Sequence, residues 1–122
     1  MLMDKSIIIK VLLSVLAISI GQVFLKLSAL SVGTGQLLGI KLGKYLFINI
    51  YLIIGIVILG GGTLLWVWVL RTIPLSTAYP FMALAFVLVP AFSYFILDEA
   101  VSWGHILGFL LIIAGVVVVS RQ

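Results

Sequence analysis

The chain has 122 residues, a formal net charge of +4 and no cysteine, and 65% of its residues are hydrophobic while only 8% are charged. Its mean hydropathy of +1.46 lies far above that of soluble domains, in which about half of the residues are apolar and about a quarter charged, so the composition indicates an integral membrane protein. The seven Lys and Arg residues are scattered, which argues against a nucleic-acid surface, and without cysteine the chain has no disulfide and no thiolate metal site.

Four apolar segments are long enough to cross a bilayer, whose hydrocarbon core of about 30 Å requires about 20 helical residues. An open sheet cannot satisfy its backbone in lipid, so we predict an all-α membrane protein with a single four-helix transmembrane domain over residues 1–122. The first segment lacks a clear signal-peptide cleavage site and is predicted to be retained. The predicted spans are residues 7–30, 45–70, 74–97 and 102–119.

The connections carry almost no charge bias between the two sides of the membrane. The short second and third connections predict that spans two, three and four are antiparallel neighbours, and residues 31–44 have room for a short amphipathic turn. A nearly equal distribution of Lys and Arg is expected of a dual-topology protein, but a weak bias or a partner could equally fix one orientation. One side would carry Lys5, Lys10, Arg71 and Arg121, and the other Lys26, Lys41 and Lys44.

The first span carries a polar stripe, because Ser19, Gln22 and Lys26 fall within an arc of about 60° on a helix. Lys26 lies 16 residues after Lys10, about 24 Å along a helix and less than the thickness of the hydrocarbon core, so a snorkelling anchor is one interpretation. The other is that Lys26 faces a cavity between subunits and binds an anionic headgroup, with hydrogen bonds from Gln22 and Ser19.

The first three predicted spans contain no carboxylate, because no Asp or Glu occurs between Asp4 and Asp98. Proton-coupled export of a lipophilic cation requires a membrane-buried carboxylate that binds the proton and the cation in turn. The sequence therefore disfavours cation antiport.

The second span contains Gly55 and the run 60–62, which permit close helix packing or bending. Near its end, Trp66 and Trp68 are typical of an interfacial aromatic belt.

The third span contains Pro80 and Pro90, each of which removes an internal hydrogen bond, so we predict a kinked helix. Bent helices expose backbone to a substrate path in many transporters. Tyr79 could point its hydroxyl into such a path or belong to the aromatic belt, and the sequence does not separate these alternatives.

The fourth span places Gly104, Gly108 and Gly115 within an arc of about 40°, which predicts a dimer interface through close helix contact. Before it, Asp98 and Glu99 favour a helix N-terminus, and capping is the simpler interpretation than substrate contact.

Ser102 is a candidate cap of this fourth helix, and His105 in its first turn is most simply an interfacial residue. One histidine without clustered partners makes no metal site, and nucleophile, base and metal constellations are all absent. We therefore expect neither an enzyme nor a cofactor.

In combination and order, "GQVFLKLS" in the first span, "IPLSTAY" at the start of the third and "LDEAVSWGHILG" leading into the fourth resemble the small multidrug resistance branch of the drug/metabolite transporter superfamily. The resemblance covers nearly the whole chain. It implies antiparallel dimers packed through span four, a chamber formed by the first three spans, and alternating access.

Two departures separate the chain from the drug-exporting members. Ile18 stands where they carry a first-span glutamate, and Met82 where they carry an aromatic residue. The resemblance is closer to the small subunits that flip aminoarabinose linked to undecaprenyl phosphate, which work as heteromeric pairs. It implies a polyprenyl-phosphate sugar as substrate, with Lys26 at its phosphate.

The main hypothesis is thus a flippase or transporter of a lipid-linked sugar in the bacterial inner membrane, acting as a homodimer or as a heterodimer with a related small subunit. One alternative is an exporter of small cationic or polar compounds, and another is an accessory subunit that stabilises a larger membrane complex.

Overall fold

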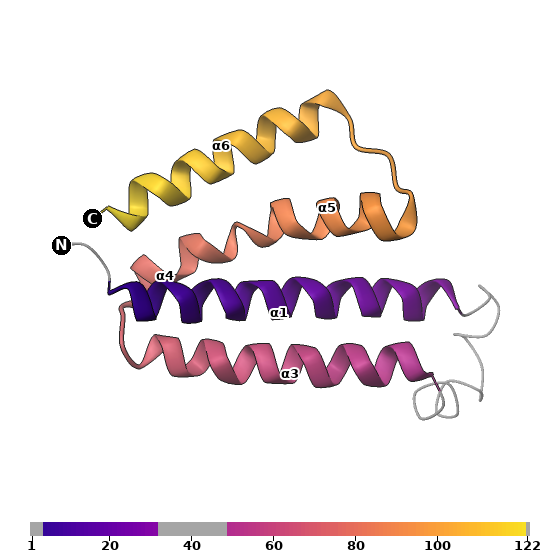
Figure 1. Ribbon diagram of the computed structural model, residues 1–122, viewed down its shortest axis with the longest axis horizontal. Helices are drawn as coiled ribbons and strands as arrows, with labels where there is room; N and C mark the ends of the chain where they lie inside the picture. The colour runs from indigo at the N-terminus through magenta and orange to yellow at the C-terminus, as the bar shows by residue number, and fades with distance from the viewer. Residues whose placement is uncertain (1–3, 32–48, 122) are drawn as a thin grey trace.

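The regular structure is entirely helical within residues 4–31 and 49–121, which are the residues that the computed structural model describes (Figure 1). Four helical segments are long and apolar enough to span a membrane: α1, α3, α4 with α5 taken together, and α6. The predicted all-α fold with four spans is confirmed. The helices are α1 (Lys5–Leu30), α3 (Ile50–Leu70), α4 (Leu75–Met82), α5 (Ala85–Leu97) and α6 (Trp103–Ser120).

Side-chain caps mark where three of the helices begin, α1 at Asp4, α3 at Asn49 and α6 at Ser102. Asp4 accepts a hydrogen bond from the Ser6 amide at 3.2 Å, so α1 begins two residues before the predicted Ile7. Asn49 accepts from the Leu52 amide at 3.1 Å, so α3 begins at Ile50, later than the predicted start at residue 45. Residues 45–48, and the amphipathic turn predicted within 31–44 apart from Ser31, lie outside the described residues.

The helices lie in one row, in the order α6, α4 with α5, α1 and α3 (Figure 1). The first span therefore separates the second from the third over most of their length, and α1 packs most extensively against α3 and next against α5. The prediction that spans two and three are neighbours holds only beside their connection, where Val69 of α3 packs with Ala78 and Phe81 of α4. A short connection brings helices together at the turn without forcing them to pack along their length. Spans three and four are neighbours, as predicted.

Close packing between α1 and α3 depends on three glycines. A Cβ atom on Gly62 would lie 3.0 Å from Ile18 Cγ1 and 3.1 Å from Ala17 Cβ, and one on Gly55 would lie 3.2 Å from Phe24 Cβ. A Cβ on the third glycine, Gly21, would lie 2.6 Å from Leu59 Cγ.

A buried hydrogen bond crosses the same contact, because the hydroxyl of Ser14 donates to the Gly62 carbonyl at 2.9 Å. By contrast, Cβ atoms on Gly60 and Gly61 would meet nothing within 4 Å. Close approach, one of the two roles predicted for the second-span glycines, thus belongs to Gly55 and Gly62, which are seven residues apart and share one helix face.

The third span is broken between α4 and α5, at Ala83 and Leu84, which confirms the predicted kink (Figure 1). The break lies between Pro80 and Pro90, each of which lacks a backbone N–H. Across it the amides of Ala83 and Leu84 donate to the carbonyls of residues three positions earlier, Pro80 and Phe81, both at 3.0 Å. Such tight turns replace the α-helical pattern locally.

The hydrophobic core lies at the end of the molecule where the two termini lie (Figure 1). There Val116 of α6 packs with Ala78 and Phe81 of α4, Val69 of α3 and Val11 of α1. Towards its N-terminus α6 has few contacts, and Val116 is its only buried residue. The helix is therefore held at one end, and its other end diverges from α5.

Candidate functional site

An ion pair joins α1 to the connection between α5 and α6, at the end opposite the termini. Lys26 Nζ lies 3.3 Å from Glu99 Oε1, and the two side chains are 49% and 45% exposed. An ion pair this exposed typically contributes about 0.2–1 kcal/mol to stability. Lys26 and Glu99 therefore present two opposite charges that a ligand can separate at small cost.

The backbone turn after α5 directs Glu99 back towards α1. Asp98 adopts the left-handed conformation with φ of 52°, the only positive φ of a non-glycine residue within the described part of the chain. Asp tolerates this conformation better than most residues. The amide of Glu99 then donates to the Ser93 carbonyl at 3.3 Å, which closes the end of α5.

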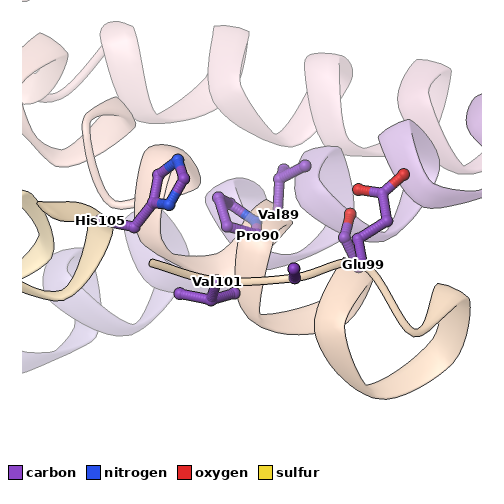
Figure 2. A pocket seen from close by; sticks show the side chains of 7 residues that line it. Val89, Pro90, Glu99, Val101 and His105 are labelled. Carbon is purple, nitrogen blue, oxygen red and sulfur yellow. The ribbon is translucent and has the colours of Figure 1, made fainter. Parts of the chain in front are cut away.

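A pocket of about 250 Å³ opens between α5 and α6 beside this ion pair (Figure 2). Figure 2 shows the Glu99 carboxylate and the His105 imidazole on opposite sides of the pocket, with Val89 and Pro90 between them. The pocket thus combines an apolar floor with polar groups at its sides. Its lining is completed by Ser93, Ala100 and Val101.

His105 is fixed by the cap of α6. Its Nδ1 accepts a hydrogen bond from the Ser102 amide at 3.0 Å, and its own amide donates to the Ser102 hydroxyl at 3.5 Å, which forms a capping box. Because Nδ1 is the acceptor, a neutral imidazole carries its proton on Nε2. Nε2–H is thus a donor available to a ligand in the pocket.

A second, apolar pocket of about 330 Å³ lies between α1, α5 and α6, nearer to the end where the termini lie. Its lining is entirely aliphatic, and Val87 and Leu88 of α5 directly precede the Val89 and Pro90 of the first pocket. The remaining lining residues are Leu12, Leu16, Leu84 and Ile113. The space beside α6 is therefore polar near Glu99 and apolar further into the span.

Of the stripe predicted on α1, two members are accessible and one is buried. Gln22 is exposed one helical turn before Lys26. Ser19 is fully buried, and its hydroxyl donates to the Val15 carbonyl at 2.8 Å. In this conformation Gln22 and Lys26 share an open surface, whereas the Ser19 hydroxyl already has a partner.

Tyr79 is 64% exposed on α4, near the start of the third span, and so lies at the end of the molecule opposite Lys26 (Figure 1). One chain does not bring these two predicted site residues together. At the same end as Tyr79, Lys10 Nζ lies 4.5 Å from the ring centroid of Trp68, a cation–π contact between α1 and α3.

The glycine stripe of α6 faces open space. A Cβ atom on Gly108 or Gly115 would meet nothing within 4 Å, and one on Gly104 would meet only the Ser102 hydroxyl oxygen, at 3.7 Å. Within residues 4–31 and 49–121 no neighbouring helix covers this stripe, so α6 offers a face on which a second helix can pack.

Two site features were missed by sequence reasoning. Glu99 was assigned to capping, but Ser102 caps α6 and Glu99 pairs with a lysine 73 positions away, which no local pattern indicates. The interfacial position predicted for His105 stays a prediction, and its part in the capping box of α6 was missed because the usual residue three positions after a capping serine is Glu or Gln. Among residues 4–31 and 49–121, no three His, Cys, Asp or Glu side chains could hold a metal ion.

Comparison with known proteins gives a family and a set of relatives. The EamA-like transporter family matches residues 6–121. The chain is 46% identical over 66 residues to the probable 4-amino-4-deoxy-L-arabinose-phosphoundecaprenol flippase subunit ArnE of Sodalis glossinidius, an alignment covering 54% of this chain and 60% of that protein. No solved structure matches the chain significantly.

Proteins of the same name in two other bacteria give similar values. Identity is 45% over 64 residues for Pseudomonas aeruginosa, covering 52% of this chain and 56% of the relative. It is 39% over 72 residues for Proteus mirabilis, covering 59% and 64%. The chain thus spans between 56% and 64% of the length of these curated relatives.

Proposed function

Since the chain belongs to the EamA-like transporter family, we propose that it is a transport subunit of the small multidrug resistance type that moves a polyprenyl-phosphate-linked sugar across the bilayer by alternating access. It is a multi-pass protein of the bacterial inner membrane. The relatives named as flippase subunits for an aminoarabinose linked to phosphoundecaprenol support this substrate class.

The observation that carries the proposal is the polarity of the space beside α6. A lysine and a polar-sided pocket lie at one end, and an aliphatic cavity lies further into the span. An amphiphilic anion has the same two parts, since its phosphate requires a cation while its hydrocarbon chain requires an apolar surface. In the proposed complex Lys26 binds the phosphate and Gln22 donates a hydrogen bond to it.

The proposal also includes a second subunit, packed in the opposite orientation, with residues 1–122 forming one transmembrane domain of each. An antiparallel arrangement would bring Tyr79 of one chain to the membrane side on which Lys26 of the other lies, which one chain alone does not do. The uncovered glycine stripe of α6 is the proposed contact.

Export of small cations is the second candidate, because Glu99 supplies a carboxylate at the site. That carboxylate is paired with Lys26, so a cation would have to displace the lysine and would then lie beside it. The pairing favours a ligand that carries a negative charge. The third candidate function is that of an accessory subunit without transport activity of its own.

Reconstitution tests the proposed function. The purified protein, alone and together with a related small subunit, is placed in liposomes that contain fluorescent polyprenyl-phosphate sugar, and loss of fluorescence to an external quencher reports transfer between leaflets. We expect transfer well above that of protein-free liposomes. Transfer of a lipophilic cation instead would favour the exporter, and transfer of neither would favour the accessory subunit.

Gly108→Leu is expected to abolish most dimer formation, because a leucine would separate helices that pack closely along the glycine stripe. The measurement is crosslinking in mild detergent. Val117→Leu is the matched control, since Val117 lies on the same helix about 180° away from Gly108 and is 44% exposed. An unchanged dimer yield in Gly108→Leu would locate the contact elsewhere.

The weak charge bias predicts a topology that small changes can shift. Adding two lysines next to Lys5 is expected to bias the N-terminal side towards the cytoplasm, and adding two next to Arg121 should act in the same direction. A C-terminal reporter with separate readouts on the two sides of the membrane measures the outcome. If the reporter stays on one side in every variant, expressed without a partner, the chain does not have dual topology.

A further inference from the structure

The end of the molecule where the termini lie carries basic residues that pair with no carboxylate in the described part of the chain. Among residues 4–31 and 49–121 the only ion pair joins Lys26 to Glu99, at the opposite end. Asp4 is the single acidic residue near the termini, and it caps α1 by accepting from the Ser6 amide. The charge at this end is thus available to an anion that is not part of the chain. The basic residues there are Lys5, Lys10, Arg71 and Arg121.

Two of these cations lie at one indole ring. Lys10 Nζ of α1 lies 4.5 Å from the ring centroid of Trp68 on α3. Arg71 follows Trp68 by three residues and keeps the right-handed helical conformation at the end of α3, so the two side chains are neighbours on one helix face. Both are exposed. Lys10, Trp68 and Arg71 thus form a basic cluster with an aromatic centre on the surface of the bundle.

The surface next to this basic cluster, towards the middle of the spans, is apolar and open. Leu13 follows Lys10 by one helical turn, Leu64 precedes Trp68 by one turn, and both are exposed. Gly61 lies seven residues before Trp68 and therefore on the same face, and a Cβ atom there would meet nothing within 4 Å. Indole rings prefer the headgroup level of a bilayer. The cluster therefore has its charges at headgroup level and an aliphatic surface below them, which is the arrangement of a bilayer lipid.

We propose that the basic cluster of Lys10, Trp68 and Arg71 binds the phosphate of an anionic phospholipid of the surrounding bilayer, with an acyl chain lying over Leu64 and Gly61. A guanidinium group can bind two phosphate oxygens at once, and the lysine adds a second positive charge. A zwitterionic lipid fits less well, because its own ammonium group would be repelled by both cations. This site lies at the opposite end of α1 from Lys26, so the inference does not depend on the transported substrate.

The test uses the tryptophan of the cluster as a local reporter. The chain has three tryptophans, so Trp66→Phe with Trp103→Phe leaves Trp68 as the only one. The full-length protein is reconstituted in mixed bilayers of phosphatidylglycerol and phosphatidylcholine in which one lipid carries brominated acyl chains, since bromine quenches indole fluorescence only at short range. We expect phosphatidylglycerol to be preferred beside Trp68 by about fivefold to twenty-five-fold, at about fivefold for each basic residue.

Variants in the same background separate a site from general surface charge. Lys10→Gln and Arg71→Gln should each lower the preference by about fivefold, whereas Lys10→Arg should keep it. Arg121→Gln is the matched control, because it removes the same charge from the same end of the molecule but lies on α6, away from Trp68. It should leave the preference within about twofold. Quenching in pure brominated phosphatidylcholine should be the same in every variant, which shows that Trp68 keeps its place.

Three results would overturn the inference. Equal quenching of Trp68 by the two brominated lipids in the background variant would mean that no anionic lipid is selected there. A loss in Arg121→Gln as large as in Lys10→Gln would assign the preference to the total charge of this end. Absence of quenching by either lipid would mean that a second protein chain, and not lipid, covers this face of α3.

Discussion

Lys26→Gln is expected to lower transport of a polyprenyl-phosphate sugar by about tenfold to a thousandfold at matched levels of correctly inserted protein. Removing one partner of a partly dehydrated charge pair costs about 2–5 kcal/mol, which corresponds to that range. The structure adds a reason for a large loss. With the lysine gone, Glu99 remains beside the phosphate without a compensating charge.

Three further variants separate phosphate binding from membrane anchoring. Lys26→Arg should retain substantial transport under both interpretations, because it keeps the charge. Gln22→Ala should cost only about 1 kcal/mol, as expected for one neutral hydrogen bond. The double variant Lys26→Gln with Glu99→Gln should recover part of the loss, because the uncompensated carboxylate is gone. Full transport by Lys26→Gln would leave Lys26 as an anchor alone.

Hydropathy was sufficient to predict the four spans, because each is far more apolar than a soluble helix and is bounded by charges or breakers. The positions of Pro80 and Pro90 also predicted the break between α4 and α5, since both remove backbone donors wherever the helix packs. The predicted second span begins at residue 45 because the residues before Asn49 are apolar as well, whereas the described helix α3 begins at Ile50. A hydropathy profile does not indicate where a helix is capped. The cap is Asn49, whose side chain accepts a hydrogen bond from the Leu52 amide.

The order of the helices could not be predicted from connection lengths. The central place of α1 follows from the fit of Gly55 and Gly62 against its surface, a property of two distant segments together. The same limit applies to the site. Lys26 was identifiable because a charge in an apolar span is unusual, whereas Glu99 lies outside the spans, where acidic residues are ordinary.

Gly62→Leu is expected to destabilise the fold more than any other single glycine substitution in α3. A Cβ atom alone would lie 3.0–3.2 Å from atoms of Ala17 and Ile18, including the backbone nitrogen of Ile18, so the larger side chain must push α1 away from α3. Overpacking of this kind costs about 1–3 kcal/mol, and separating the helices also breaks the bond from the Ser14 hydroxyl to the Gly62 carbonyl.

Gly61→Leu is the matched control, because it adds the same side chain one position away, where a Cβ would meet nothing within 4 Å. Both variants gain helix propensity over glycine, so only the contact with α1 differs between them. The measurement is the temperature at which half of the detergent-solubilised protein remains in solution after heating. We expect a marked decrease for Gly62→Leu and little change for Gly61→Leu. Equal values for the two would mean that α1 and α3 do not pack through Gly62, and the central position of α1 would then have to be revised.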